Sequence, residues 1–150
     1  MTAVEVKNTV LAVLAAAGAI IANALGGWDA LLKVLVALMV ADYLTGLTVA
    51  GVFKKSRHTQ SGALSSTVGF MGLLKKGAVL LLIYIAVKLD AAIGQSYVRS
   101  CVIIFFIGNE GLSLLENVGL MGVQYPRFLQ KMLETLRDKG DNGGDDNDGK

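Results

Sequence analysis

Four long apolar segments, each near the length needed to cross a bilayer, constrain this chain more than any other feature. They run over about residues 9–26, 30–53, 77–98 and 100–120 of the 150-residue sequence. Because the hydrocarbon core of a membrane is ~30 Å thick, a helix of about 20 apolar residues spans it. The segments lack the period of two that β-barrel strands show. The pattern predicts an all-α integral membrane protein with three to four transmembrane helices.

The first segment, residues 9–26, has two interpretations. Ala22-Asn23-Ala24 follows an apolar run and resembles a signal-peptidase site. The run is long for a signal peptide, however, and Glu5 offsets the charge of Lys7 ahead of it. We expect a retained helix, with cleavage after Ala24 as the alternative. The number of spans, three or four, depends on this choice.

Basic residues are distributed unevenly between the segments. The stretch 54–76 has no acidic residue and contains Lys54, Lys55, Arg57, Lys75 and Lys76. A basic cluster can bind nucleic acid, but between two apolar segments it is more typical of a cytoplasmic loop. We expect residues 61–76 to form a short amphipathic helix on the membrane surface. With four spans, the distribution of lysine and arginine predicts that both termini are cytoplasmic.

The chain changes character after Gly122, so residues 1–122 form the predicted transmembrane domain. Residues 123–140 carry an apolar side made of Phe128, Leu129, Met132, Leu133 and Leu136, with basic residues on the other side. This pattern predicts a cytoplasmic amphipathic helix that dips into the leaflet or packs on a neighbour. Residues 141–150 contain only Asp, Asn, Gly and Lys, which predicts a disordered acidic tail.

Charged side chains inside the apolar segments are the candidates for function. Asp42, Lys88, Asp90 and Glu110 all fall within these segments. Each costs roughly 2.5–3.5 kcal/mol at the centre of a membrane helix, so each is expected to pair or to face water. Lys88 and Asp90 point about 200° apart on a helix and cannot pair with each other. We therefore expect Asp42 or Glu110 to be the counter-charge of Lys88.

The residues alone leave the role of these charges open. They can form an ion pair that fixes helix packing, or a wall that becomes hydrated when the helices rearrange. A transporter is less favoured, because internal repeats and paired broken helices are lacking. With one histidine, one cysteine and none of the common catalytic or nucleotide-binding motifs, the sequence predicts no enzymatic activity, cofactor or metal site.

Two motifs resemble those of a known family. Asp42-Tyr43-Leu44-Thr45-Gly46 resembles the DYLTG-type motif of the toxin-secretion/phage-lysis holin family, the bacteriophage holin 4 group. The run NEGLSLLEN at residues 109–117, followed by GVQYP at 122–126, resembles the family's second signature. The resemblance extends over about residues 36–139 and does not include the acidic tail. The matching positions are Asp42, Tyr43, Thr45, Gly46, Asn109, Glu110, Gly111, Ser113, Glu116 and Asn117.

The resemblance implies a holin of the bacterial inner membrane, which oligomerises and forms lesions that release an endolysin or a toxin at host lysis. Its implied partners are copies of itself, the lipid bilayer and a functionally coupled endolysin or secreted toxin, with no nucleic acid. A small ion channel or transporter and a membrane scaffold are the alternatives. The candidate polar and assembly residues inside the membrane are Asp42, Thr45, Gly46, Lys88, Asp90, Asn109, Glu110, Ser113, Glu116 and Asn117.

Overall fold

The computed structural model describes residues 2–53 and 66–142, and the regular structure in these ranges is α-helical. The helices are α1 (Ala3–Ala24), α2 (Ala30–Gly51), α3 (Ser66–Ile93), α4 (Val98–Leu120) and α5 (Arg127–Asp141). By length and composition, α1 to α4 can each cross a membrane. The prediction of an all-α membrane protein is confirmed.

Local sequence explains where the first two helices begin. Thr2 and Glu5 form a capping box at the start of α1. Asp29 begins α2, because its side chain accepts a hydrogen bond of 2.9 Å from the backbone N–H of Leu32. Between the two helices, Gly26 and Gly27 have φ angles of 86° and 105°, which glycine adopts without strain. The chain therefore turns sharply where α1 ends.

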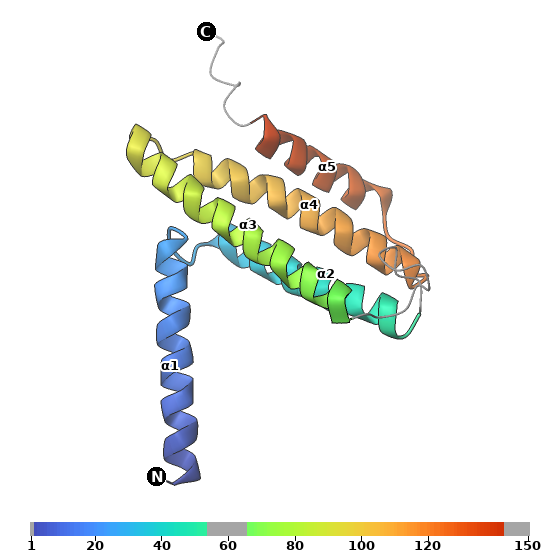
Figure 1. Cartoon of the computed structure of the whole chain (residues 1–150). Coiled ribbons are helices and arrows are strands. Elements are labelled where there is room, and N and C mark those ends of the chain that lie inside the picture. The colour runs from blue at the N-terminus through green and yellow to red at the C-terminus, as the bar shows by residue number, and fades with distance from the viewer. Residues whose placement is uncertain (1, 54–65, 143–150) are drawn as a thin grey trace.

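Helices α2, α3 and α4 run side by side, and α4 contacts α2, α3 and α5 (Figure 1). Aliphatic side chains fill the space between the three bundled helices, which explains why these helices stay together. The buried set contains Leu32, Leu35 and Met39 of α2, Val79 and Ile83 of α3, and Ile103 and Ile107 of α4.

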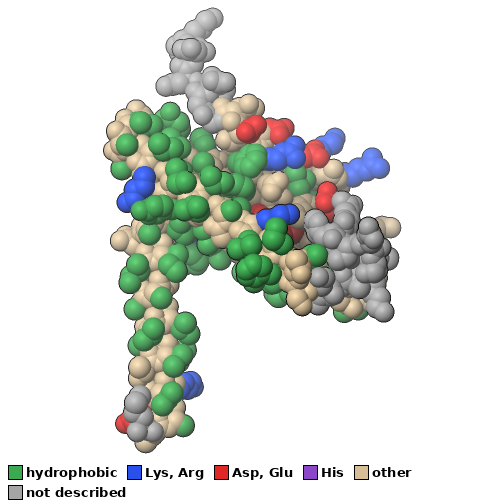
Figure 2. Space-filling view, in the orientation of Figure 1, with side chains coloured by type: hydrophobic (Ala, Val, Ile, Leu, Met, Phe, Trp, Pro, Cys, Tyr) green, Lys and Arg blue, Asp and Glu red, His purple; other side chains and the backbone are tan. Residues whose placement is uncertain are grey.

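Helix α1 stands apart from this bundle. It projects at a steep angle, and none of its residues is buried (Figure 1). Hydrophobic side chains cover much of α1 and of the visible bundle surface (Figure 2). Such a surface is unfavourable in water and is expected where helices meet lipid. For α1 to cross a membrane together with the bundle, the chain has to turn about Gly26 and Gly27.

Helix α3 differs most from the sequence prediction. It begins at Ser66 rather than at Gly77, so residues 66–76 continue into the third apolar segment instead of forming a separate surface helix. It ends at Ile93, where Gly94 follows with a φ of 67°. At the C-terminal end, α5 continues to Asp141. The predicted basic loop from Lys54 to residue 65 and the acidic tail from residue 143 onward lie outside the described residues.

Candidate functional site

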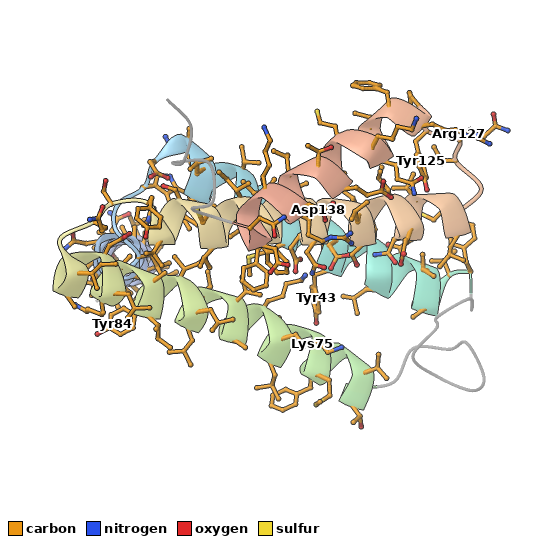
Figure 3. The ribbon with its side chains drawn as sticks, turned by 90° about the horizontal axis from the view of Figure 1, so that it is seen from above. Tyr43, Lys75, Tyr84, Tyr125, Arg127 and Asp138 are labelled. Carbon is orange, nitrogen blue, oxygen red and sulfur yellow. The ribbon has the colours of Figure 1, made fainter. Side chains whose placement is uncertain are left out.

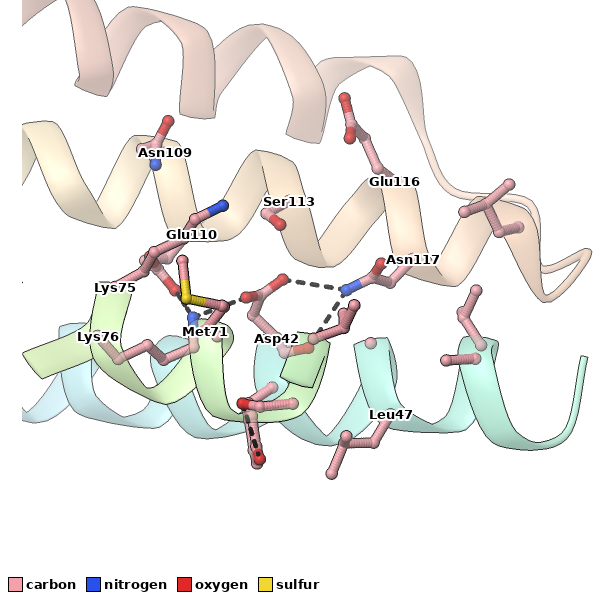
Figure 4. A pocket seen from close by; sticks show the side chains of 18 of the residues that line it. Asp42, Leu47, Met71, Lys75, Lys76, Asn109, Glu110, Ser113, Glu116 and Asn117 are labelled. Atoms are coloured by element: carbon pink, nitrogen blue, oxygen red, sulfur yellow. Dashed lines mark hydrogen bonds and ion pairs between the residues drawn. The ribbon is translucent and has the colours of Figure 1, made fainter. Parts of the chain in front are cut away.

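A lysine and two carboxylates meet between α2, α3 and α4. Lys76 of α3 donates a hydrogen bond of 2.7 Å to Asp42 of α2 and a second hydrogen bond to Glu110 of α4 (Figure 4). The side chains of Lys76, Asp42 and Glu110 are 15%, 14% and 9% exposed. One cation thus faces two carboxylates, all largely shielded by apolar helices. We call these three residues the charged cluster.

Asn117 of α4 connects the charged cluster to the motif at residues 42–46. Its amide nitrogen lies 3.0 Å from Oδ1 of Asp42, 3.2 Å from the backbone oxygen of Asp42 and 3.2 Å from the hydroxyl oxygen of Thr45. The hydroxyl of Thr45 donates to the backbone oxygen of Ala41 at 2.8 Å, so its oxygen is oriented to accept from Asn117. A Cβ atom at Gly46 would lie 3.6 Å from the same amide nitrogen. The two sequence motifs, far apart in the chain, therefore bind each other.

Tyr43 faces α3 rather than the charged cluster (Figure 3). Its hydroxyl donates to the backbone oxygen of Gly69 at 3.4 Å. A Cβ atom at Gly72 would lie 3.4 Å from the Tyr43 ring, so the helix surface here leaves little spare room for the ring. Asp42 and Tyr43 are adjacent in one motif, and their contacts thus hold α2 to α4 and to α3.

A cavity of about 640 Å³ opens beside the charged cluster. Asn109 and Glu116 point away from Lys76 (Figure 4) and are exposed, whereas Glu110 is buried. Polar cavities of sufficient size hold water that bonds to otherwise buried groups. The polar side chains that line the cavity are Asp42, Tyr43, Thr67, Lys75, Lys76, Asn109, Glu110, Ser113, Glu116 and Asn117. Its lining therefore offers hydrogen-bonding partners to water. In the described part of the chain, no group of three or more His, Cys, Asp or Glu residues is placed to hold a metal ion.

Eight of the ten candidate residues come together at this place. Thr45 does so through its contact with Asn117, and Gly46 and the others line the cavity. The eight are Asp42, Thr45, Gly46, Asn109, Glu110, Ser113, Glu116 and Asn117. The other two, Lys88 and Asp90, lie elsewhere.

The predicted pairing of Lys88 with Asp42 or Glu110 is wrong, because Lys76 occupies that position. Lys88 is exposed on α3, and its ammonium lies 5.1 Å from the ring centre of Tyr84, within range of a cation–π contact. The sequence prediction missed Lys76 because it ended the surface stretch at this residue and began the span at the next.

Asp90 connects the end of α3 to the start of α4. Its carboxylate accepts hydrogen bonds from the backbone N–H groups of Val98 and Arg99, both at 2.9 Å. These two N–H groups have no acceptor within their own helix, so Asp90 acts as a cap from the preceding helix. Its burial is therefore explained by the turn between α3 and α4.

Arg99 extends this turn to the connection between α1 and α2. Its guanidinium donates to the backbone oxygens of Leu25 at 2.6 Å and Gly27 at 3.1 Å, and to the carboxylate of Asp29 at 2.6 Å. The hydrogen bond from Arg99 is the largest cause that lowers the pKa of Asp29 below its usual value of 3.8. The two turns therefore lie at one end of the bundle.

The chain matches the model of the bacteriophage holin family over residues 19–138. An uncharacterized protein of Listeria monocytogenes is 40% identical, covering 77% of this chain and 78% of its own length. One of Clostridium perfringens is 35% identical, covering 76% and 80%. A protein of Bacillus phage phi105 named probable holin is 27% identical, covering 73% and 76%. No solved structure matches the chain. Since the family match includes both motifs that build the charged cluster, this protein belongs to the bacteriophage holin family.

Proposed function

We propose that this protein is a holin that associates with further copies in the cytoplasmic membrane of a bacterium. There it opens lesions through which an endolysin or a toxin leaves the cell. Membership of the holin family and four helices of spanning length support this role. The observation that carries it furthest is the charged cluster, which is largely buried between three membrane-spanning helices beside a partly polar cavity.

The charged cluster favours an abrupt transition between two arrangements. In the packed bundle, Lys76 compensates the carboxylates of Asp42 and Glu110. Separating the helices in lipid would leave these charges without partners, which is strongly unfavourable. Separating them around water would not, because water solvates each group. Intermediate, dry arrangements are therefore disfavoured, and the helices either stay packed or surround an aqueous lesion.

We also propose that both termini face the cytoplasm. The contact between Arg99 and Asp29 supports this topology, because it brings two connections to one end of the bundle. Four crossings would place both of them on the outer side. That side would carry fewer lysine and arginine residues than the side with residues 54–76 and α5, as the positive-inside rule expects.

Controlled expression in a bacterium, together with a cytoplasmic endolysin, tests the proposal. We expect growth to continue for a period and then to stop abruptly, with loss of membrane potential and release of the endolysin. A small ion channel, the first alternative, would lower the potential gradually and retain the endolysin. A scaffold would produce neither effect, and either of these outcomes would contradict the holin proposal.

A further inference from the structure

Helix α5 is packed unusually closely against α4. A Cβ atom at Gly108 would lie 2.5 Å from the backbone nitrogen and 2.7 Å from the Cβ of Arg137. One at Gly111 would lie 2.6 Å from a methyl group of Leu133, and one at Gly140 would overlap the backbone of Phe105. At Gly108 and Gly140 the atoms in the way include backbone atoms of the facing helix, so the two backbones are in contact there. The arrangement is therefore a specifically built helix pair.

Charged side chains of α5 reach away from α4, although Arg137 begins at the contact with Gly108. The side chains of Arg137 and Asp138 are 41% and 63% exposed and lie 3.3 Å apart. The hydrogen bond between Gln130 and Glu134 is also exposed. Charged side chains of both signs occur along the whole helix: Arg127, Lys131, Glu134, Arg137, Asp138, Lys139 and Asp141. Leu133 and Leu136 thus face the bundle, whereas the charged side chains, together with the exposed Phe128 and Met132, face outward.

The antiparallel course of α5 carries this charge toward the middle of the membrane. Tyr125 lies beside Gly119 near the end of α4, whereas Gly140 lies beside Phe105. Phe105 is 15 residues before Leu120, a distance of about 22 Å along a helix. If α4 crosses a hydrocarbon core ~30 Å thick, Arg137 and Asp138 lie near its centre. Charged side chains at that depth face protein or water rather than lipid.

From this geometry we propose that α5 folds back into the membrane along α4 and forms a water-facing wall of the lesion. This inference rests on the proposed holin function and assigns the lining of the aqueous path to α5. Gly122, with a φ of 89°, lies in the turn that reverses the chain between α4 and α5. In the packed bundle α5 is already docked on α4, so opening keeps this helix pair together and exposes its charged side to water.

Thiol accessibility tests where the charged side of α5 lies. Cys101 is replaced by serine, and Asp138→Cys is compared with Leu81→Cys, which replaces an exposed residue on the outer surface of α3. Both variants are reconstituted in liposomes that contain a fluorescent dextran. We expect a membrane-impermeant, bulky thiol reagent to label Cys at 138 and to reduce release at least fivefold. The variant at 81, which faces lipid, is expected to stay unlabelled and to release dextran normally.

A disulfide lock tests whether α5 stays on α4 in the open state. In the Cys101→Ser background, Gly111→Cys and Leu133→Cys place two thiols across the contact between α4 and α5, because the Leu133 side chain that would meet a Cβ at Gly111 is itself replaced. We expect the oxidised protein to release dextran at least as fast as its reduced form. Loss of release on oxidation, restored by reduction, would overturn the proposal, because α5 would then have to leave α4 for opening.

Glycine substitutions test the same contact without new thiols. Gly108→Leu and Gly111→Leu have no room beside α5, whereas Gly77→Leu is matched in size and lies where no neighbour is within 4 Å. We expect the first two to insert normally and release at least tenfold less dextran, with Gly77→Leu within twofold of wild type. Normal dextran release by both Gly108→Leu and Gly111→Leu would contradict the proposal that α5 forms a wall of the lesion. An absence of release from wild-type protein would instead contradict the proposed function itself.

Discussion

Lys76 and Asp42 form an ion pair of 2.7 Å between α3 and α2, with both side chains largely buried between the helices. Glu110 of α4 binds the same ammonium, so one lysine connects three helices. The pair is directional, unlike the aliphatic contacts around it. It therefore specifies how far along one another the helices are placed, which apolar packing alone defines less sharply.

Replacing Lys76 with methionine is expected to destabilise the bundle strongly. The substitution keeps the length of the side chain but leaves Asp42 and Glu110 facing each other without a cation. Removing one partner from a buried ion pair is expected to lower the free energy of unfolding on the order of 3 kcal/mol. Thermal unfolding in a mild detergent, followed by circular dichroism, measures the effect.

Lys88→Met is the matched control for this experiment, because Lys88 is exposed on the same helix. Its effect on the free energy of unfolding is expected to stay within about 0.5 kcal/mol. A triple variant, Lys76→Met with Asp42→Asn and Glu110→Gln, removes all three charges and is expected to regain much of the lost stability. Equal destabilisation by Lys76→Met and Lys88→Met would show that the charged cluster does not hold the helices.

Asn117→Leu is expected to weaken the contact between α4 and α2. The substitution removes the amide that bonds to Asp42 and Thr45 and leaves their oxygens without this donor. Loss of a donor to part-buried acceptors costs about 1–3 kcal/mol. Asn109→Leu, at an exposed position of α4, is the control and should change stability little. If the two variants unfold at the same temperature, the contact between the two motifs contributes nothing measurable to stability.

Length and hydropathy were enough to predict the helical class, but they misplaced one boundary. Lys75 and Lys76 suggested the end of a surface stretch, whereas the structure continues α3 through them. The helical periodicity of α3 would have indicated that Lys76 belongs to this helix and lies on its buried face. Val79, Ile83, Ala86 and Asp90 are buried at steps of three and four, and Lys76 falls on the same face, three residues before Val79. A lysine on a buried face requires a partner, which Asp42 and Glu110 provide.

The motifs contain most of the polar site, because Asp42, Thr45 and Asn117 all belong to them. The packing of α5 on α4 could not be predicted in the same way. The apolar side of α5 fits a leaflet or a helix equally well, and Gly108 and Gly111 indicate close approach without naming the partner. The role of Asp90 was also hidden, since a cap supplied by the preceding helix depends on how the chain turns between them.

The contact between Asp29 and Arg99 is expected to make stability depend on pH in the acidic range. The pKa of Asp29 is lowered below 3.8 in the folded protein, chiefly by its hydrogen bond with Arg99. The contribution of this bond is therefore fully present above about pH 5 and is lost as the pH falls below 3.8 through the folded-state pKa. We expect the difference in Tm between wild type and Asp29→Asn to shrink over that range. Asp138→Asn, at an exposed carboxylate, should show a smaller change with pH, and an unchanged difference for Asp29→Asn would contradict the assignment.

The topology itself is open to a direct test, because the contact between Arg99 and Asp29 requires two connections on one side of the membrane. A reporter fused after Lys55 is expected to be active in the cytoplasm, and one fused after Gln95 is expected to be active outside it. The excess of lysine and arginine in residues 54–76 favours this orientation over its reverse. N-terminal sequencing of the mature protein decides whether α1 is retained, as we expect, or is cleaved after Ala24. Cleavage there would leave both reporter results unchanged, since Lys55 and Gln95 are separated only by α3. Activity of both reporters on the same side would contradict a membrane-spanning α3, and the reversed pair of results would contradict cytoplasmic termini.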